Sequence, residues 1–202
     1  MTKIAVLVSG GGTNLQALID AQQAGKIENG QISLVISSNP KAYALERAAK
    51  AAIPSEVLRR RDFSDAEEYG KALTALLENA DIGLIVLAGF MTVLPDSFCR
   101  HFENRIINVH PSLIPSFCGE GFYGLRVHEA ALQKGVKVTG ATVHFVNQIP
   151  DGGEIVAQKA VEILPGDTPE VLQRRVMEQA EWLLLPRAAE QVCAAIQNEK
   201  GE

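Results

Sequence analysis

The sequence has few cysteines, and they lack the spacing of a disulfide framework or a structural zinc site. Its 202 residues include three cysteines, Cys99, Cys118 and Cys193, which are widely separated and form no C-x-x-C pattern. Disulfide-rich domains carry paired cysteines, and structural zinc sites carry clusters of them. We therefore expect three reduced thiols and no structural zinc.

Long apolar runs and an excess of positive charge are also absent. No stretch reaches the roughly 18 apolar residues of a membrane-spanning helix, and the apolar run after Met1 is too short for a secretory signal. The net charge of −5 gives no overall attraction to nucleic acid or to an anionic membrane. We expect a cytoplasmic protein with no nucleic-acid or membrane partner and a local site for any anionic ligand.

What the sequence does contain is an alternation of strand and helix patterns. Four apolar runs typical of buried parallel strands lie at residues 4–8, 32–36, 83–88 and 105–109, and a short strand is expected around residues 56–58 as the third along the chain. Helical patterns between them predict a Rossmann-like, doubly wound α/β fold with a mostly parallel sheet in the strand order 3-2-1-4-5. Residues 140–146 and 155–163 alternate, which predicts an antiparallel pair at one sheet edge. We expect a single domain.

A glycine loop joins the first strand to the first helix. Residues 9–14, Ser-Gly-Gly-Gly-Thr-Asn, lead into a helical pattern with Thr13 or Asn14 as the expected cap. Backbone N–H groups and the positive helix end converge there, which suits a phosphate. A dinucleotide fingerprint needs glycine in place of Leu15 and a P-loop needs Gly-Lys-Ser/Thr, so a phosphate monoester fits best. The alternative is a glycine turn that only allows tight packing.

The run at residues 105–109 leads into two polar side chains and a proline. Asn108 and His110 are two residues apart and should project from the same side of a strand, while Pro111 ends the pairing. Open α/β sheets bind ligands at the carboxyl ends of their strands. The pair is therefore a candidate catalytic site, although buried polar groups in a strand are often only structural.

Three segments are candidates for the surroundings of this pair. Residues 88–94 are unusually apolar, and form either core under a loop or a wall for a flat aromatic ligand. Residues 112–126 are rich in glycine, proline and aromatics, which indicates an adjustable loop or lid. Asp151 lies in an Asp-Gly turn, and turn chemistry alone accounts for an aspartate there.

Several shorter signals mark helix ends and basic or metal-binding candidates. Ser64 opens a capping box for a helix to about residue 78, Thr168 caps a long C-terminal helix, and Pro186 predicts a break or kink in it.

The basic residues 59–61 form either a phosphate patch or a solvated loop. The remaining histidines show no metal-ligand pattern and are assigned to the surface or to strand packing, namely His101, His128 and His144.

Four motifs taken together resemble one enzyme family across almost the whole chain. They are residues 9–14, Leu-Ala-Gly-Phe-Met at 87–91, Ile-Asn-Val-His-Pro-Ser-Leu at 107–113 and Asp-Gly-Gly at 151–153. The sequence resembles the phosphoribosylglycinamide formyltransferases of the folate-dependent formyltransferase superfamily. The Asn-x-His-Pro-Ser-Leu element also occurs in methionyl-tRNA formyltransferases and formyltetrahydrofolate deformylases. The glycine loop selects the first family, and 202 residues leave no room for the extra domain of the other two.

The resemblance implies a role for individual residues. Asn108, His110 and Asp151 would be the catalytic trio. The phosphoribosyl substrate would be held by Gly12, Thr13, Asn14 and Glu181, and the cosubstrate 10-formyltetrahydrofolate would be bordered by Met91, Thr92, Val93, Leu94 and Asn108. Residues 1–100 would form the phosphoribosyl-binding half and residues 101–202 the catalytic and folate-binding half. The substrates would be small molecules, and the expected assembly is a monomer or homodimer, with no metal.

Two positions depart from the family pattern. An arginine that relatives carry early in the third helix falls near Ala66 here, so its contact on the folate side is either lost or taken over by residues 59–61. The loop at residues 118–123 is longer than in many relatives.

The implied reaction passes a formyl group to a primary amine and creates an oxyanion. Asn108 can donate a hydrogen bond to that oxyanion, and His110 can stabilise charge or shuttle a proton. Asp151 can hold the imidazole and favour its charged form. No serine or cysteine has a convincing base, so we expect direct transfer. The alternatives are a 10-formyltetrahydrofolate hydrolase and a non-catalytic phosphometabolite-binding domain. A formyltransferase for methionyl-tRNA ranks below both.

Overall fold

A single seven-stranded sheet organises the protein, whose computed structural model describes residues 1–201. The strand order is β3-β2-β1-β4-β5-β6-β7, in which β1 to β5 are parallel while β5 with β6 and β6 with β7 are antiparallel. The bounds are β1 (Thr2–Val8), β2 (Gly30–Ser37), β3 (Ser55–Val57), β4 (Leu84–Leu87), β5 (Ile106–His110), β6 (Val138–Phe145) and β7 (Ile155–Glu162). The predicted strand order and antiparallel edge are confirmed.

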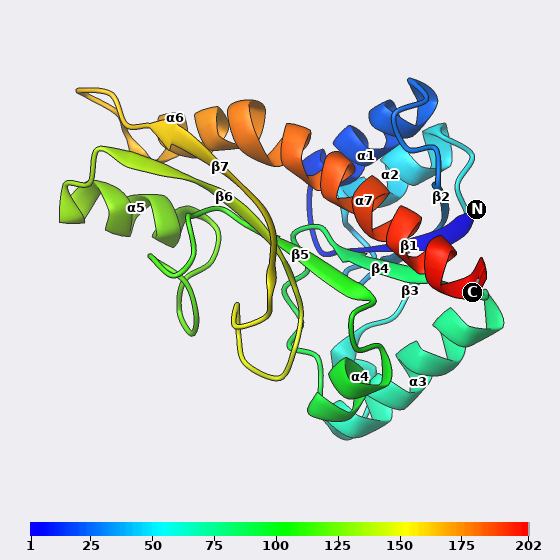
Figure 1. Cartoon of the computed structure of the whole chain (residues 1–202). Coiled ribbons are helices and arrows are strands. Elements are labelled where there is room, and N and C mark those ends of the chain that lie inside the picture. The colour runs from blue at the N-terminus through cyan, green and yellow to red at the C-terminus, as the bar shows by residue number, and fades with distance from the viewer. Residues whose placement is uncertain (202) are drawn as a thin grey trace.

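Helices cover both faces of the sheet (Figure 1). On one face lie α1 (Thr13–Gln23), α2 (Tyr43–Lys50), α6 (Pro169–Val176) and α7 (Trp182–Gly201), with a widened π-helical turn, η2 (Met177–Glu181), joining the last two. The other face carries α3 (Ala66–Asn79) and α4 (Asp96–His101), preceded by the short η1 (Arg60–Asp62). The remaining helix, α5 (Leu125–Lys134), packs against α6.

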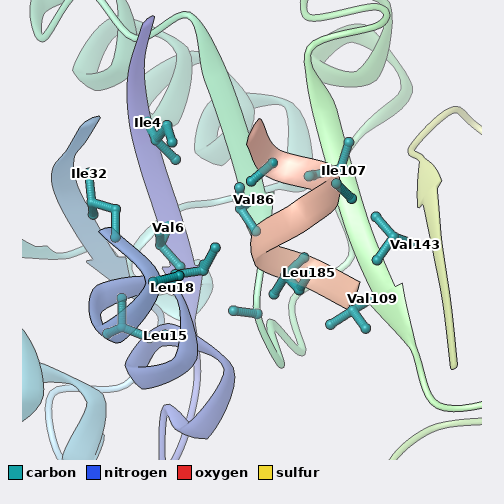
Figure 2. Close-up of a cluster of buried hydrophobic side chains, with 14 of the residues drawn as sticks. Ile4, Val6, Leu15, Leu18, Ile32, Val86, Ile107, Val109, Val143 and Leu185 are labelled. Atoms are coloured by element: carbon teal, nitrogen blue, oxygen red, sulfur yellow. The ribbon is translucent and has the colours of Figure 1, made fainter. Parts of the chain in front are cut away.

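The central strand β1 is apolar from Ile4 to Val8 because both of its faces are covered there. Ile4 and Val6 join the cluster that contains Leu185 of α7, while Ala5 and Leu7 face the opposite cluster under α3 and α4 (Figure 2). Alternating side chains of a strand point to opposite faces, so a strand between two helical layers has no polar side. Burying each large side chain contributes roughly 1.5–3 kcal/mol.

Two predicted helix caps are wrong in detail. Gly12, not Thr13 or Asn14, is the N-cap of α1, and no side chain caps this helix. The amide of Asn14 is instead bonded to Glu181, 2.7 Å away. At α3 the cap is Asp65, whose carboxylate accepts from the Glu68 N–H at 2.8 Å, while the Ser64 hydroxyl donates to the Glu68 carboxylate. Thr168 caps α6 as predicted.

The irregularity of the C-terminal helix also differs from the prediction. Pro186 lies inside α7, and the widened turn η2 comes before it at Met177–Glu181. A proline removes one backbone donor and crowds the turn that precedes it, so the distortion falls on the N-terminal side of the ring. Of the helices in residues 1–201, none has the length and apolar character needed to span a membrane.

His128 of α5 is fully buried, and neither ring nitrogen has a hydrogen-bond partner among the described residues. Burial, and to a lesser degree His110, lowers the pKa of His128 from 6.5 to about 4. In the unfolded chain this imidazole has its usual pKa, so as the pH falls it takes up a proton at a higher pH than in the folded protein. The free energy of unfolding should therefore fall as the pH drops from about 6.5 to about 4.

We predict that His128→Leu flattens this acid dependence. Because the variant has no imidazole at this position, its free energy of unfolding should fall by on the order of 3 kcal/mol less than that of the wild type between about pH 6.5 and about pH 4. Urea unfolding across that range measures the difference. His101→Gln, which changes an exposed histidine, is the control, and identical acid slopes in His128→Leu and the wild type would refute the prediction.

Candidate active site

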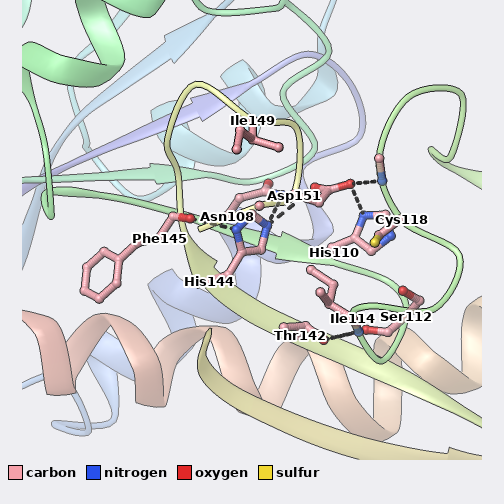
Figure 3. Close-up of polar contacts among 12 residues, drawn as sticks. Asn108, His110, Ser112, Ile114, Cys118, Thr142, His144, Phe145, Ile149 and Asp151 are labelled. Carbon is pink, nitrogen blue, oxygen red and sulfur yellow. Dashed lines mark hydrogen bonds and ion pairs between the residues drawn. The ribbon is translucent and has the colours of Figure 1, made fainter. Parts of the chain in front are cut away.

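The two polar side chains of β5 meet the turn that joins β6 to β7. His110 is 4% exposed, and its Nδ1 lies 3.5 Å from Oδ2 of Asp151. Asn108 lies on the same side of β5, facing the same turn (Figure 3). The contact between His110 and Asp151, inferred in the sequence only from the resemblance, is present in the structure.

The turn that carries Asp151 is held tightly against β6. Asp151 has a φ of 54°, and a Cβ on Gly153 would lie 1.8 Å from the carbonyl oxygen of Phe145, so this position accepts only glycine. The Asp151 carboxylate accepts a hydrogen bond from the Gly119 N–H at 2.8 Å. Burial raises the pKa of Asp151, but the contact with the His144 ring, the hydrogen bond from the Gly119 N–H and the nearby His110 together bring it below its usual value.

His110 is enclosed by oxygen acceptors. Its Nε2–H donates to the carbonyl oxygen of Phe117 at 2.8 Å, and its Nδ1 faces Asp151. Burial lowers the pKa of His110, and although Asp151 and the Phe117 carbonyl both raise it, the net direction is downward. As expected, the contact with Asp151 by itself favours the charged imidazole. The pKa of His110 is nevertheless lowered overall, because the effect of burial is larger.

The loop between β5 and α5 covers this cluster. Phe117 and Gly119 supply the carbonyl and the N–H that contact His110 and Asp151, and Ser112 Oγ donates to the Ser116 carbonyl at 2.5 Å. The loop thus uses main-chain groups to hold two of the polar side chains of the site. The sequence predicts an adjustable loop or lid at residues 112–126, and the first part of this segment lies beside the polar cluster (Figure 3).

His144 is a member of the cluster that the sequence did not identify. This residue of β6 is 2% exposed and pairs directly with Asn108 across the sheet. Its Nδ1–H donates to the Phe145 carbonyl at 2.8 Å, while its Nε2 lies 3.2 Å from Nδ2 of Asn108 and 3.5 Å from Oδ1 of Asp151. The pairing register between β5 and β6 would have revealed it, but this register cannot be read from the sequence of either strand alone.

The glycine loop meets the end of the η2 turn. Gly12 has a φ of 71°, and a Cβ there would lie 2.7 Å from the Cβ of Ala44, so the loop passes close to α2. Asn14 donates to Glu181, and both side chains are buried. Burial raises the pKa of Glu181, opposed by the Asn14 hydrogen bond, and Oδ1 of Asn14 has no protein partner among residues 1–201.

Residues 91–94 line a cavity of about 790 Å³. Met91 is 57% and Val93 is 85% exposed, so they are not core, whereas Leu94 packs on the cluster under α3. The N–H of Met91 donates to Ser9 Oγ at 2.9 Å, which ties this segment to the glycine loop. Asn108, which was grouped with these residues, does not line the cavity.

Ala66, the position near which the resemblance predicts an arginine, also lines this cavity. Of the neighbouring basic residues, Arg60 lines the cavity with Arg100, while Arg59 pairs with Asp62 at 2.6 Å. Across the described part of the chain, no group of three or more histidine, cysteine, aspartate or glutamate side chains is arranged to hold a metal ion.

Comparisons with known proteins agree on one family. The family model described as formyl transferase matches residues 2–188. The phosphoribosylglycinamide formyltransferase of Haemophilus influenzae is 44% identical over 186 residues, which cover 92% of this chain and 84% of that protein. The trifunctional purine biosynthetic protein adenosine-3 of Drosophila pseudoobscura is 46% identical over 92% of this chain, which spans only 13% of the length of that relative.

Solved structures give the same result. The glycinamide ribonucleotide transformylase 1 of Symbiobacterium toebii superimposes with a TM-score of 0.90 at 39% identity, covering 96% of this chain and 89% of that one. The phosphoribosylglycinamide formyltransferase of Brucella melitensis gives 0.86 at 40% identity, covering 96% of both chains.

The raised pKa of Glu181 predicts that this side chain costs stability near neutral pH. The unfolded carboxyl ionises near pH 4.5, whereas the folded one holds its proton to higher pH, so stability falls as the pH rises through this range. We expect Glu181→Gln to raise the free energy of unfolding by about 1 kcal/mol at neutral pH and to remove this slope.

Denaturant unfolding between about pH 5 and about pH 8 measures the effect. Glu178→Gln is the matched control, because it changes an exposed glutamate in the same η2 turn. A Glu181→Gln variant that is less stable than the control at every pH would contradict the prediction.

Proposed function

The chain belongs to the formyl transferase family, and on this basis we propose that it transfers the formyl group of 10-formyltetrahydrofolate to the amine of phosphoribosylglycinamide in purine biosynthesis. The observation that carries the proposal is the convergence of Asn108, His110 and Asp151 at the carboxyl end of β5. An amide donor, an imidazole and a carboxylate are the groups that acyl transfer to an amine requires.

The proposed reaction is a direct attack by the amine on the formyl carbon. The carbon becomes tetrahedral and its oxygen gains negative charge, which the free N–H of the Asn108 amide would stabilise. Loss of one such donor costs roughly 2.7–4 kcal/mol in other acyl-transfer enzymes. The amine nitrogen loses a proton, the folate nitrogen gains one as the bond between carbon and folate nitrogen breaks, and no covalent enzyme intermediate forms.

His110 and Asp151 would manage the proton. Because burial lowers the pKa of His110, the free imidazole is neutral near neutral pH and can accept a proton. Asp151, with a lowered pKa, is ionised beside it and would stabilise the imidazolium once it forms. The ring would then be positively charged while the oxyanion is negatively charged.

We assign His144 as a positioning residue. Because its Nδ1–H donates to the Phe145 carbonyl, His144 can use Nε2 to accept a hydrogen bond from the Asn108 amide. This contact would turn the NH₂ group of Asn108, rather than its oxygen, toward β6 and leave its second hydrogen for the oxyanion. The contact of Asp151 with both His110 and His144 would align the two histidines.

The substrates would occupy the two regions beside this cluster. Gly12, Thr13 and Asn14 would hold the phosphoribosyl group at the start of α1, and Glu181 would contact its ribose. Met91, Thr92, Val93 and Leu94 would border the folate together with Asn108. Because Arg60 lines the same cavity as Ala66, it is our candidate for the role of the missing family arginine.

We further propose that no metal takes part, that the protein is cytoplasmic, and that it works as a monomer or homodimer. Residues 1–100 would supply the phosphoribosyl-binding half and residues 101–202 the catalytic and folate-binding half. Two segments would cross this division, since Met91 to Leu94 belong to the folate side and Glu181 to the phosphoribosyl side.

Purified protein with 10-formyltetrahydrofolate should release tetrahydrofolate only when phosphoribosylglycinamide is present. His110→Ala should reduce this rate to background while substrate binding, measured by calorimetry, stays within a few-fold. Release without the amine would point to a hydrolase, and binding without release to a non-catalytic domain. Either result would overturn the transferase assignment.

Substitution of His144 should lower kcat with little change in KM. We expect His144→Leu to reduce kcat by roughly a hundredfold, as for loss of one oxyanion donor. His144→Gln, whose oxygen can accept from Asn108, should retain more activity and show a changed pH profile. His101→Gln is the control, and equal losses in the Leu and Gln variants would argue that His144 only fills space.

A further inference from the structure

A groove of about 680 Å³ lies between α1 and α7, apart from the cluster around His110. Its floor is made by a stripe of small residues, Ala17, Ala21 and Ala24, on α1, and by Trp182, Leu183 and Pro186 on α7. Small side chains opposite large ones leave a trough, and Leu183 remains 59% exposed in it. The volume is in the range of small-molecule sites, roughly 300–1,000 Å³.

The charged groups of the groove leave positive charge available. Its cations, Lys26, Arg47 and Arg187, outnumber its two carboxylates. The carboxylates are hydrogen-bonded within the protein: Asp20 accepts from Gln16 at 2.8 Å, and both oxygens of Glu190 accept from Asn29. The side chains of Lys26 and Arg187, in contrast, make no hydrogen bond or ion pair within residues 1–199, and both are exposed. In a protein of net charge −5, this rim is therefore locally suited to an anion.

We infer that this groove is a second ligand site, which binds an aromatic anion. The flat apolar body would lie on the alanine stripe and against Trp182 and Leu183, and the anionic group would be held by Lys26 and Arg187. The ligand chemistry is an aromatic ring system with one phosphate, sulfonate or carboxylate. Nucleoside monophosphates and aryl sulfonates both satisfy it.

The groove also adjoins the proposed phosphoribosyl site without coinciding with it. Thr13 lies at one end, and α1 extends about 16 Å from there to the end near Lys26. Trp182 directly follows Glu181, whose carboxylate holds Asn14. A ligand on Trp182 would therefore contact the helix that positions Glu181, and binding at the two sites would be coupled in both directions.

Trp182 is the chain's single tryptophan, so its indole N–H gives one assignable NMR resonance. Anilinonaphthalene sulfonate should shift this resonance in a saturable manner, and adenosine monophosphate should do the same if the natural ligand is a nucleotide. Inorganic phosphate alone should not. The double variant Lys26→Gln with Arg187→Gln should weaken sulfonate binding about tenfold, and Leu183→Asn by a similar factor.

The charge-matched control is Lys134→Gln with Lys137→Gln, which removes two exposed cations near α5 and should leave sulfonate affinity unchanged. Equal affinities in the two double variants, or an indole resonance that does not move, would overturn the proposal. Complete competition by phosphoribosylglycinamide would also overturn it, since the groove would then be part of the substrate site. A sulfonate response without a nucleotide response would support the site and exclude nucleotides as its ligands.

Discussion

The arrangement of the site depends on the Asp151 carboxylate, which lies between two histidines in a largely buried position. Oδ2 faces His110 and accepts from the Gly119 N–H, and Oδ1 faces His144. Through these contacts one side chain connects β5, β6, the turn between β6 and β7, and the loop over the crevice. A buried carboxylate is stable only when such partners surround it, so these four segments must come together in one geometry.

Burial and hydrogen bonding act in opposite directions at the titratable groups of the site, and their balance differs from group to group. Desolvation prevails at His110 and Glu181, whose charged forms are disfavoured, while hydrogen bonds prevail at Asp151, which stays ionised. A neutral imidazole next to an ionised carboxylate is poised to take up a proton. The environment of the side chains, not their identity alone, therefore sets the acid and base roles we propose.

The proposed substrate sites share the sheet edge where the parallel strands end, but the helices give them separate walls. The glycine loop after β1 and the segment after β4 are joined by the hydrogen bond from Met91 to Ser9. On the α7 side, the buried pair of Asn14 and Glu181 continues into Trp182 and the groove against α1. The continuous segment of η2 and α7 thus contributes to the core, to the proposed phosphoribosyl site and to a surface groove.

The sequence by itself determined the strand segments, the glycine loop and the position of Asn108 and His110 on one side of β5, because strand and helix periodicities are local properties of the chain. The strand order followed from the doubly wound arrangement that alternating strands and helices favour. Only the tertiary structure decided what depends on partners far apart in sequence. Asn14 is drawn from its expected capping role by Glu181, and His144 reaches Asn108 through the register between strands. The net pKa of His110 likewise follows from its burial, which is set by the whole fold and not by neighbouring residues.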